Sequence, residues 1–451
     1  MISIKLQLYY LFTKYFQIWA KLVLRRWKPI IIAVVGSAGK TSTMLMIEQV
    51  LKNHVSIKTS YKTNAASSIP LNIIGLTQHS FSAFEWLILL IKAPFAGLKT
   101  YKEKIYLCEL DTDRDGEMKL HTNLIKPDIC CWISASPAHT ANFSGLTDQQ
   151  VYQNMLDDQS EAVKKTKSLI LVNEDDTAIK DVIKQIKTPI QKITFNSDNN
   201  DLIWLLEHKL SFNGTNIDFG LNPAKLASLI GRNINYNHIE IHNPHTLISF
   251  INLYGVAMAI IIGISFGLDP KQIAQALQKF RLPPGRMSLF AGKHATTIID
   301  STYNASKLAT KDALDVLKLI GTNKTLAVLG DLRELGTIAK QEHEDLAKYI
   351  VSQKIDRVIL VGPTMKDFAL PIFINNGYQL GQTVFALSPK ETKGLINQAG
   401  FLKNGETVLI KGSQNTLFLE EIVASLLVSQ KDYQNLCRRE AIWNVARAKI
   451  Y

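Results

Sequence analysis

The sequence is poor in cysteine, and the cysteines that it has follow no recognisable pattern. Its 451 residues contain four of them, Cys108, Cys130, Cys131 and Cys437, without a CxxC pair or a zinc-type cluster with histidine. Few and unpaired thiols are typical of a reducing compartment, so we expect a cytoplasmic protein without disulfide bonds. The lack of zinc spacing and of an RNA-binding signature also argues against a nucleic-acid partner.

Acidic residues are missing from the beginning of the chain, where none precedes Glu48. Residues 1–29 are basic and aromatic, and their charges interrupt every apolar run well short of the ~20 residues that a membrane-spanning helix needs. No small-residue cleavage site of a signal peptide is apparent. We expect a basic amphipathic helix that either lies on an anionic membrane surface, peripheral to its inner face, or packs on the next domain. Its basic residues are Lys5, Lys14, Lys21, Arg25, Arg26 and Lys28.

The overall composition is that of a globular protein, with 46% hydrophobic and 20% charged residues. The length predicts two or three domains. An excess of 51 Lys and Arg over 39 Asp and Glu gives a formal charge of +12, which favours an anionic partner such as a nucleotide, a phosphorylated substrate or a membrane surface. A short apolar run at residues 86–91 is ambiguous, although such runs more often belong to a core.

Residues 31–43 form the most informative stretch, because an apolar run leads into a glycine-containing turn and then a helical pattern. Gly36 and Gly39 allow the backbone to approach an anion, Lys40 can reach terminal phosphates, and Thr41 can bind magnesium. The general phosphate-loop pattern GxxxxGK[ST] begins with a glycine, and this chain has Val34 at that position. The turn is nevertheless expected to hold a nucleoside triphosphate, through Gly36, Ser37, Ala38, Gly39, Lys40, Thr41 and Ser42.

Strand-like apolar runs alternate with helical patterns on both sides of the turn Pro283-Pro284. This alternation predicts parallel sheets with crossover helices. A polar, strand-like excursion is expected at residues 196–245, followed by an apolar helix at 247–266. The predicted strands lie near residues 31–35, 105–110, 129–133 and 169–172, and then near 297–299, 325–329, 357–361 and 407–410. We expect an α/β fold with a leader at 1–29, a P-loop central domain on a mostly parallel sheet at 30–284, and a C-terminal Rossmann-like α/β domain at 285–451.

Polar residues follow several of these predicted strands. Glu109 ends one run, and His139 follows the next, so both are expected to face the phosphate loop across a parallel sheet. Glu109 could hold magnesium directly or through water. In the second half the residues that follow strands are Asp300, Tyr303 and Asn304, the run Gly330–Gly336, and Lys411-Gly412-Ser413. Polar groups at three strand ends of one sheet indicate a site.

Taken together, these motifs resemble the Mur ligase family of ATP-dependent amide-forming enzymes. The resemblance covers residues 30 to about 430 in family order. The matching pieces are Gly36–Thr43, Asn64 with Pro70, Glu109 with Gly116-Glu117, Pro137-Ala138-His139, Asn173 with Asp175-Asp176, Pro284-Gly285-Arg286, Asp300 with Tyr303-Asn304, Gly330–Gly336, His343 and Lys411-Gly412-Ser413.

The resemblance implies roles for particular residues, with ATP and Mg²⁺ as cofactors. The catalytic residues it implies are Lys40, Glu109, His139 and Arg286. Beyond the phosphate loop, those near the nucleotide are Asn173, Asp175, Arg286, Asp300 and Asn304. The metal would be held by Thr41, Glu109 and His139. The substrate residues are Asn64, Asp331, Glu334 and Lys411.

Three departures from the family pattern bear on the substrates. The family's amino-terminal domain, which grips UDP, is not expected here, because the basic leader stands in its place. The helix after His139 lacks the family's carbamate-forming lysine, and we expect Asp157 or Asp158 to supply that carboxylate, since both groups offer hard oxygen ligands. Asp300-Ser301 and Ser306-Lys307 replace the usual Asp pair and Asn-Pro, which leaves the amine substrate open.

The resemblance implies that a carboxylate is activated as an acyl phosphate and then attacked by an amine. The leading hypothesis is a ligase that adds D-alanyl-D-alanine or a similar amine to a peptidoglycan precursor. A second hypothesis keeps the chemistry but takes a substrate without UDP, such as a polyglutamate-type chain. A third is a degenerate nucleotide-binding scaffold at the membrane.

Overall fold

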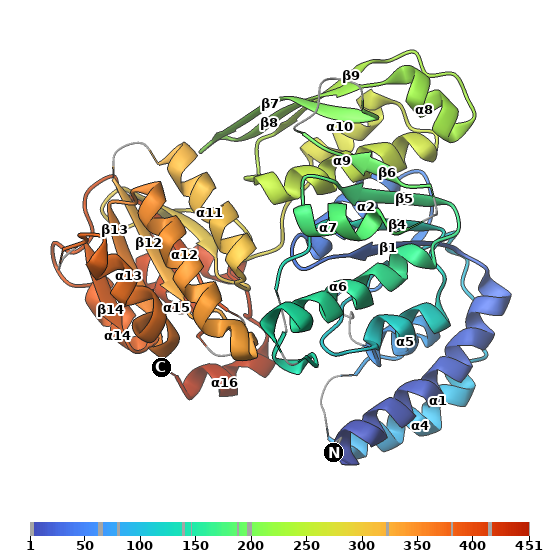
Figure 1. Cartoon of the computed structure of the whole chain (residues 1–451), viewed down its shortest axis with the longest axis horizontal. Helices are drawn as coiled ribbons and strands as arrows, with labels where there is room; N and C mark the ends of the chain where they lie inside the picture. The colour runs from blue at the N-terminus through green and yellow to red at the C-terminus, as the bar shows by residue number, and fades with distance from the viewer. Residues whose placement is uncertain are drawn as a thin grey trace.

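The computed structural model describes residues 4–61, 66–78, 82–137, 140–145, 147–186, 189–195, 201–321, 324–379, 382–413 and 417–450. These residues form two lobes, each built on its own six-stranded sheet, and a smaller three-stranded sheet that lies above the first lobe in the view of Figure 1. The predicted α/β fold is therefore confirmed.

The central sheet is entirely parallel and has the strand order β2-β3-β1-β4-β5-β6. Helices cover both of its faces, so the inner strands are buried on both sides. The sequences of these strands are therefore continuous apolar runs. The strands are β1 (Ile30–Val35), β2 (Ile57–Thr59), β3 (Ile105–Glu109), β4 (Ile129–Trp132), β5 (Leu169–Asn173) and β6 (Gln191–Ile193).

The helices divide between the two faces of the central sheet. One face carries α2 (Lys40–Leu51), α9 (Phe250–Ser265) and α10 (Pro270–Gln278). Gly255 and Gly263 of α9 lie against Thr43 and Val50 of α2, where an added Cβ would come within 2.8 Å of a neighbouring side chain. The other face carries α1 (Ile4–Trp27), α3 (Ser68–Ile74), α4 (Ala83–Ala96), α5 (Glu117–Leu124), α6 (Asp148–Lys164) and α7 (Thr177–Ile183).

A three-stranded antiparallel sheet extends the core on the α9 side, and it corresponds to the predicted strand-like excursion. Leu210 of this sheet and Leu247 after it pack with apolar residues of the second lobe, so this region joins the two lobes. Its elements are β7 (Ile203–Ser211), β8 (Gly214–Leu221), α8 (Pro223–Ile230) and β9 (His238–Asn243).

The second lobe has the strand order β10-β11-β15-β12-β13-β14, in which only β10 is antiparallel to its neighbour. Its strands are β10 (Ser288–Gly292), β11 (Thr296–Ser301), β12 (Thr325–Gly330), β13 (Arg357–Val361), β14 (Thr383–Ala386) and β15 (Thr407–Lys411). One face carries α11 (Lys307–Ile320), α12 (Ala339–Gln353) and α13 (Leu370–Asn375), and the other carries α14 (Pro389–Ile396) and α15 (Glu420–Leu426).

Short helical turns complete the fold. Two of them, η1 (Thr140–Asn142) and η2 (Gly336–Ile338), lie against each other although they come from different lobes. A π-helical turn, η3 (Met365–Ala369), leads into α13. The C-terminal segment consists of η4 (Gln430–Asn435), η5 (Ala441–Trp443) and α16 (Asn444–Ala448).

Each predicted strand coincides with an observed one, namely β1, β3, β4 and β5 in the first lobe and β11, β12, β13 and β15 in the second. The predicted apolar helix is α9, which begins at Phe250. The sequence reading missed β2, β6, β10 and β14, and each of these is an edge strand. The four cysteines are free and buried.

The basic leader is helical, and its inner face packs on the central lobe. Phe16, Ala20 and Val23 are fully buried. The side chain of Gln17 donates to the carbonyl oxygen of Leu120 at 3.0 Å. Of the two roles expected for residues 1–29, packing on the neighbouring domain is therefore present. Within the described ranges, no helix has the length and apolar character that crossing a membrane requires.

The packing of α1 predicts a clear stability difference between its inner and outer faces. Replacing fully buried Phe16 by Ala is expected to lower the free energy of unfolding by about 3–5 kcal/mol, because the apolar contacts of the ring are lost and a cavity is left in its place. The matched change Leu11→Ala removes a side chain that is 59% exposed and should cost no more than about 0.5 kcal/mol. Urea unfolding of both variants measures this, and equal losses would contradict the packing of α1.

Candidate active site

The turn between β1 and α2 fits closely against the end of β4. Gly36 has φ +137°, and a Cβ at this position would lie 2.8 Å from the carbonyl oxygen of Ser134. Gly39 has φ +81° and precedes the first residue of α2. Both positions therefore require glycine, for conformation and, at Gly36, for space. The structure thus builds the narrow backbone turn that the sequence predicts.

Hydrogen bonds fix this turn to the strand beside it. The backbone N–H of Ser37 donates to the carbonyl oxygen of Ser134 at 3.0 Å, and its hydroxyl donates to that of Ser136 at 2.6 Å. The N–H of Ala38 donates to the Ser134 hydroxyl at 2.8 Å. The N–H of Thr43 donates to the carbonyl oxygen of Gly39 at 2.9 Å. The N–H groups of residues 40–42 precede this hydrogen bond and lie at the positive end of the α2 dipole.

Acidic residues at the end of β3 and just after it contact the first two residues of α2. The ammonium of Lys40 lies 3.1 Å from a carboxylate oxygen of Asp111, and both side chains are largely buried. The hydroxyl of Thr41 donates to Glu109 at 2.7 Å. Burial alone would lower the pKa of Lys40, but the carboxylates of Asp111 and Glu109 outweigh it and raise that pKa above its ordinary value. Lys40 therefore keeps its positive charge inside the site.

The start of α9 lies between the turn and the second lobe. A Cβ on Gly39 would meet the side chain of Ile251 at 3.1 Å. The backbone N–H of Ile251 donates at 3.1 Å to the carboxylate of Asp312, which belongs to α11. A carboxylate at a helix N-terminus is stabilising because it meets N–H groups that have no partner within the helix. The second lobe thus supplies an acceptor to the helix that borders the phosphate loop.

Asn173 and Asp175, expected near the nucleotide, lie at the carboxyl end of β5. The Asn173 amide donates to the carbonyl oxygen of Ile133 at 2.9 Å, which ties β5 to the end of β4. Asp175 accepts from the backbone N–H of Phe195 and from the Tyr254 hydroxyl, each at 2.6 Å. These contacts show how both side chains are anchored in the central lobe.

In the second lobe, Asp300 and Lys411 lie on the neighbouring strands β11 and β15. One oxygen of Asp300 accepts from the backbone N–H and hydroxyl of Thr302, while its other oxygen is buried without a hydrogen bond. Burial raises the pKa of Asp300 to about 6. Lys411 donates to the Ser301 hydroxyl at 3.2 Å and to the carbonyl oxygen of Asn304 at 2.9 Å. Burial lowers the pKa of Lys411 to about 8.

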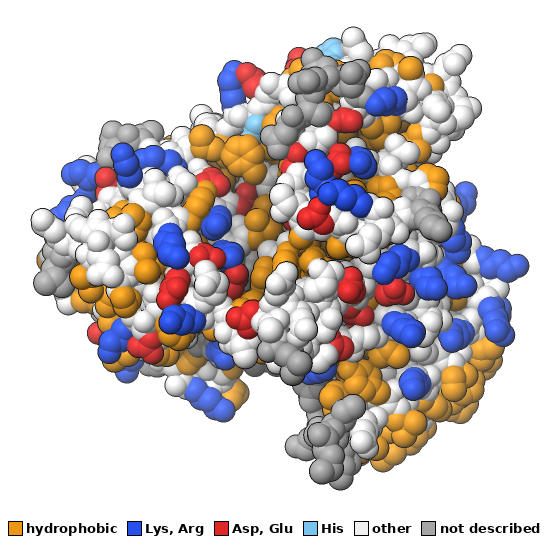
Figure 2. Space-filling model, viewed as in Figure 1, with side chains coloured by type: hydrophobic (Ala, Val, Ile, Leu, Met, Phe, Trp, Pro, Cys, Tyr) orange, Lys and Arg blue, Asp and Glu red, His pale blue; other side chains and the backbone are white. Residues whose placement is uncertain are grey.

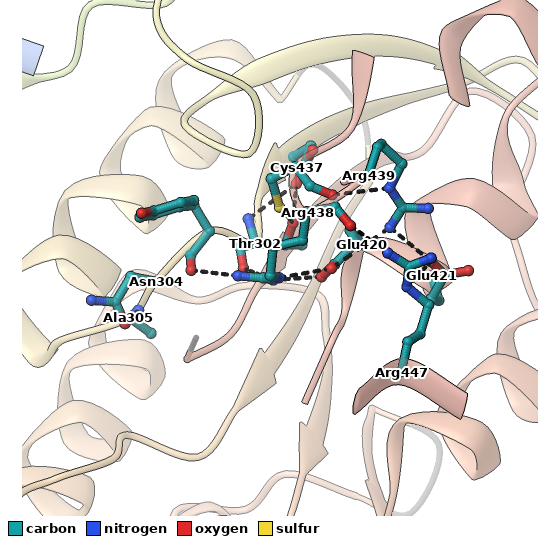
Figure 3. A network of polar contacts seen from close by, with 11 residues as sticks. Thr302, Asn304, Ala305, Glu420, Glu421, Cys437, Arg438, Arg439 and Arg447 are labelled. Carbon is teal, nitrogen blue, oxygen red and sulfur yellow. Dashed lines mark hydrogen bonds and ion pairs between the residues drawn. The ribbon is translucent and has the colours of Figure 1, made fainter. Parts of the chain in front are cut away.

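A buried ion pair holds the segment that follows β11 (Figure 3). Arg438 bonds to Glu420 through Nε at 2.8 Å and through a second nitrogen, and both side chains are buried. The same guanidinium donates to the carbonyl oxygens of Thr302 and Tyr303, each at 2.8 Å. The guanidinium of Arg286 lies over the ring of Tyr303, 4.4 Å from its centre. Arg286, Asp300 and Asn304 are therefore gathered in one cluster.

The run Gly330–Gly336 follows β12, as expected, and is held from inside its own lobe. Asp331 accepts from the backbone N–H of Met365 at 2.7 Å. The N–H of Leu332 donates to Nε2 of His343 at 3.0 Å, so Nδ1 carries the hydrogen and donates to Ala339. Burial lowers the pKa of His343, which favours this neutral form.

The far end of this run touches the central lobe. The hydroxyl of Thr140 donates to the carbonyl oxygen of Leu335 at 2.9 Å, and the N–H of Ala141 donates to that of Glu334 at 3.0 Å. Glu334 is exposed and has φ +61°. The loop after β4, which carries the predicted site residue His139, is thus joined to the loop that carries the predicted substrate residues Asp331 and Glu334.

Four predicted residues are not part of the arrangement described above, two of them because the structure does not describe them. Asn64 and His139 lie outside the described residues. Asp158 accepts from the backbone N–H groups of Gly116 and Met118, each at 3.1 Å, and thereby caps α5. Asp157 is exposed and accepts from Gln153. In the described part of the chain, neither aspartate contacts Lys40, Thr41 or Glu109, and no group of three His, Cys, Asp or Glu side chains is placed to hold a metal ion.

Four residues of this arrangement were not found by reading the sequence. Asp111 comes two positions after Glu109 in a run of acidic residues, and that spacing was the available signal. Arg438 and Glu420 are 18 positions apart near the C-terminus, and Asp312 lies within an ordinary helical pattern. Nothing local in the sequence distinguishes Arg438, Glu420 and Asp312 from surface charges.

A glycine turn leads into Lys40 and Thr41 at the carboxyl edge of a parallel sheet, opposite Glu109, and this is the arrangement of a P-loop in a two-lobed α/β protein. Two family descriptions match the chain. Residues 34–239 match the Mur ligase middle domain, and residues 285–414 match the Mur ligase glutamate ligase domain. The chain therefore belongs to the Mur ligase family, whose members are ATP-dependent ligases that form amide bonds.

Named relatives agree with this assignment. The UDP-N-acetylmuramoyl-tripeptide–D-alanyl-D-alanine ligase of Bacillus subtilis is 23% identical over 420 residues, covering 91% of this chain and 78% of that protein. The ligase of the same name from Borreliella burgdorferi is 26% identical over 346 residues, covering 74% of this chain and 63% of that protein. The crystal structure of MurF ligase from Thermotoga maritima in complex with ADP has a TM-score of 0.70 at 18% identity, covering 92% of this chain and 83% of that one.

The burial of Asp300 predicts a pH-dependent stability. The folded state raises the pKa of Asp300 to about 6, so its neutral form stabilises the fold fully below about pH 4, and this stabilisation is lost as the pH rises through about 6. Asp300→Asn stays neutral, so its stability relative to the wild type should increase by up to roughly 3 kcal/mol over that interval. Urea unfolding of both proteins between about pH 4 and 7 measures this difference. A difference that does not change with pH would contradict a buried, titrating Asp300.

Proposed function

We propose that this chain adds D-alanyl-D-alanine, or a similar amine, to the peptide carboxylate of a peptidoglycan precursor, at the expense of ATP. The observation that supports this most directly is the charged Lys40 beside the glycine turn, in a chain of the Mur ligase family. The named relatives from Bacillus subtilis and Borreliella burgdorferi are ligases of D-alanyl-D-alanine to a UDP-muramoyl tripeptide. Their names motivate the proposed substrates.

The residues of the turn fit a triphosphate. Gly36 and Gly39, both at positive φ, let the turn pack closely against the residues after β4, and the first N–H groups of α2 provide donors. Lys40 is charged and is balanced at present by Asp111. A terminal phosphate would compete with Asp111 for this lysine. The proposed nucleotide residues are the turn itself (Gly36, Ser37, Ala38, Gly39, Lys40, Thr41 and Ser42) together with Asn173, Asp175, Arg286, Asp300 and Asn304.

Mg²⁺ fits the oxygen donors at the start of α2. The Thr41 hydroxyl and the Glu109 carboxylate already lie 2.7 Å apart, and both are hard ligands of the kind that Mg²⁺ prefers. Bound there, the ion offsets negative charge on phosphate oxygens. His139 remains a proposed third ligand. Asp157 and Asp158 remain the proposed substitutes for the family's modified lysine, although Asp158 would have to leave its cap on α5.

The proposed chemistry has two steps. A carboxylate is a poor electrophile, so an oxygen of the precursor first attacks the γ-phosphorus of ATP and ADP leaves, which gives an acyl phosphate. The amine nitrogen then attacks the carbonyl carbon, phosphate leaves with its bonding electrons, and an amide forms after loss of a proton. Lys40 and the loop N–H groups stabilise charge on the phosphoryl oxygens. The catalytic set we propose is Lys40, Glu109, His139 and Arg286.

Water must be excluded, because it would hydrolyse the acyl phosphate. The bonds from Thr140 to Leu335 and from Ala141 to Glu334 support a reaction space closed by the two lobes, since they join loops of both. Arg286, Asp300 and Asn304 would then face the nucleotide from the second lobe. The proposed substrate residues are Asn64, Asp331, Glu334 and Lys411.

We further propose that the working units are the leader at 1–29, the ATP-binding lobe at 30–284 and the C-terminal lobe at 285–451. The separate sheets of the two lobes support this division. The four buried cysteines form no disulfide bond, which favours a cytoplasmic protein. A peripheral position on the inner face of the membrane, through the leader, is part of the same proposal.

The test is phosphate release by the purified full-length chain with ATP, Mg²⁺, UDP-N-acetylmuramoyl tripeptide and D-alanyl-D-alanine, with the product identified by its mass. Release should require both the tripeptide and the amine. Lys40→Ala should lower the rate by about a hundredfold or more, because the charge on the phosphoryl oxygens loses its partner.

The matched control is Lys52→Ala, which removes an exposed lysine at the other end of α2 and should leave the rate within about twofold. Undiminished phosphate release by Lys40→Ala would show that the phosphate site is assigned wrongly. Turnover with a carboxylate that lacks UDP, and none with the UDP precursor, would refute the proposed substrate.

A further inference from the structure

Helices α1 and α4 lie side by side and run in the same direction along the edge of the central lobe (Figure 1). The hydroxyl of Tyr15 on α1 donates to the carbonyl oxygen of Leu90 on α4 at 3.1 Å, and eleven positions later the guanidinium of Arg26 donates to that of Gly97. The inner sides of both helices belong to the core of the lobe. Their outer sides therefore form one continuous surface.

The outer side of α4 is apolar. Five large apolar side chains between residues 84 and 98 are each 54–73% exposed, and their spacing of three and four residues places them on one stripe. They are Phe84, Leu87, Ile91, Phe95 and Leu98. The run 86–91, which the sequence leaves ambiguous, divides between the two environments: Leu89 is buried, whereas Leu87 and Ile91 are exposed.

The outer side of α1 carries a matching stripe, in which four apolar side chains are 37–59% exposed. They are Leu8, Leu11, Ile18 and Leu22. Figure 2 shows hydrophobic side chains gathered along this edge of the molecule, with Lys and Arg side chains beside them. Single exposed apolar residues are normal on a protein surface, whereas a contiguous apolar patch marks an interaction site.

The charge around the patch is strongly one-sided. Lys14, Lys21 and Arg25 of α1 are exposed, and so are Lys92 and Lys99 on the α4 side. Helix α1 contains no acidic residue at all, and Glu85 is the one acidic residue of α4. The patch therefore combines apolar side chains for burial with positive charge that attracts an anionic surface.

We infer that this α1–α4 face docks on an anionic lipid bilayer, with the apolar stripes in the interface and the lysines at the lipid phosphates. A second copy of the chain is a poor occupant, because a twofold contact would place this basic surface against itself. The inference rests on the proposed peripheral location and extends it from the leader to α4. It does not depend on the ligase chemistry, so vesicle binding and phosphate release fail independently.

The position of the face is compatible with an open active site. Helices α1 and α4 cover the opposite face of the central sheet from α2 and α9. A bilayer against α1 and α4 therefore leaves the helix that begins at Lys40 on the other side of the sheet. Docking by this face would hold the enzyme at the membrane without covering the phosphate loop.

Vesicle flotation of the full-length chain tests the inference. We expect binding to phosphatidylcholine vesicles that contain phosphatidylglycerol, weaker binding to phosphatidylcholine alone, and loss of binding at high salt. The double variant Ile91→Gln with Phe95→Gln should weaken binding about tenfold or more, since each residue loses apolar burial. The matched control, Leu319→Gln with Ile374→Gln, changes residues of the second lobe that are 59% and 62% exposed and should bind as the wild type does.

A second pair of variants tests the charge. Lys14→Gln with Lys21→Gln should weaken binding to anionic vesicles about tenfold, because each lysine contributes near a charged surface. The control is Lys271→Gln with Lys318→Gln, which removes exposed lysines of α10 and α11 and leaves the face intact. Thermal unfolding of all variants should match the wild type, since every changed residue is exposed.

Two results would overturn the inference. The first is full vesicle binding by the Ile91 and Phe95 double variant. The second is a stable dimer in sedimentation that this variant dissociates, combined with no binding to anionic vesicles. That second result would assign the face to a contact between copies of the chain.

Discussion

The close approach of the phosphate loop to β4 is the constraint on which the rest of the site depends. A backbone without side chains at Gly36 and Gly39 lies against Ser134 and Ile133, and hydrogen bonds to the end of β4 hold it there. Because β1 is central, this contact also sets the first turn of α2 opposite the end of β3, where Glu109 and Asp111 lie. The side chains of Lys40, Thr41, Glu109 and Asp111 are thereby brought together at one edge of the sheet.

In the second lobe, the polar loop after β11 has little regular structure and is held by side chains from other segments. The carbonyl oxygens of Thr302 and Tyr303 would be left without partners at the end of β11, and the buried guanidinium of Arg438 serves both. Its charge is balanced by Glu420. Removing one partner of such a pair leaves a buried charge, which is strongly destabilising, so the C-terminal segment is part of the cluster around Asp300.

The sequence predicts best those strands that are buried on both faces of a sheet, because such strands are continuous apolar runs. The inner strands are continuous apolar runs and were located, whereas β2, β6, β10 and β14 lie at sheet edges and carry no such signal. The glycine turn and Glu109 were found because their positions follow strands directly. Arg438, Glu420 and Asp312 act through contacts between distant segments, so no local pattern reveals them, and the pairing of Lys40 with Asp111 depends on side-chain geometry.

The bond from Ile251 to Asp312 has a mechanical consequence. It places a carboxylate of the C-terminal lobe on the first turn of α9, and Ile251 itself touches the glycine that ends the phosphate loop. A rotation that separated the lobes would withdraw this carboxylate and leave the amino end of α9 short of an acceptor. The position of the C-terminal lobe is therefore coupled to the glycine turn through the amino end of α9.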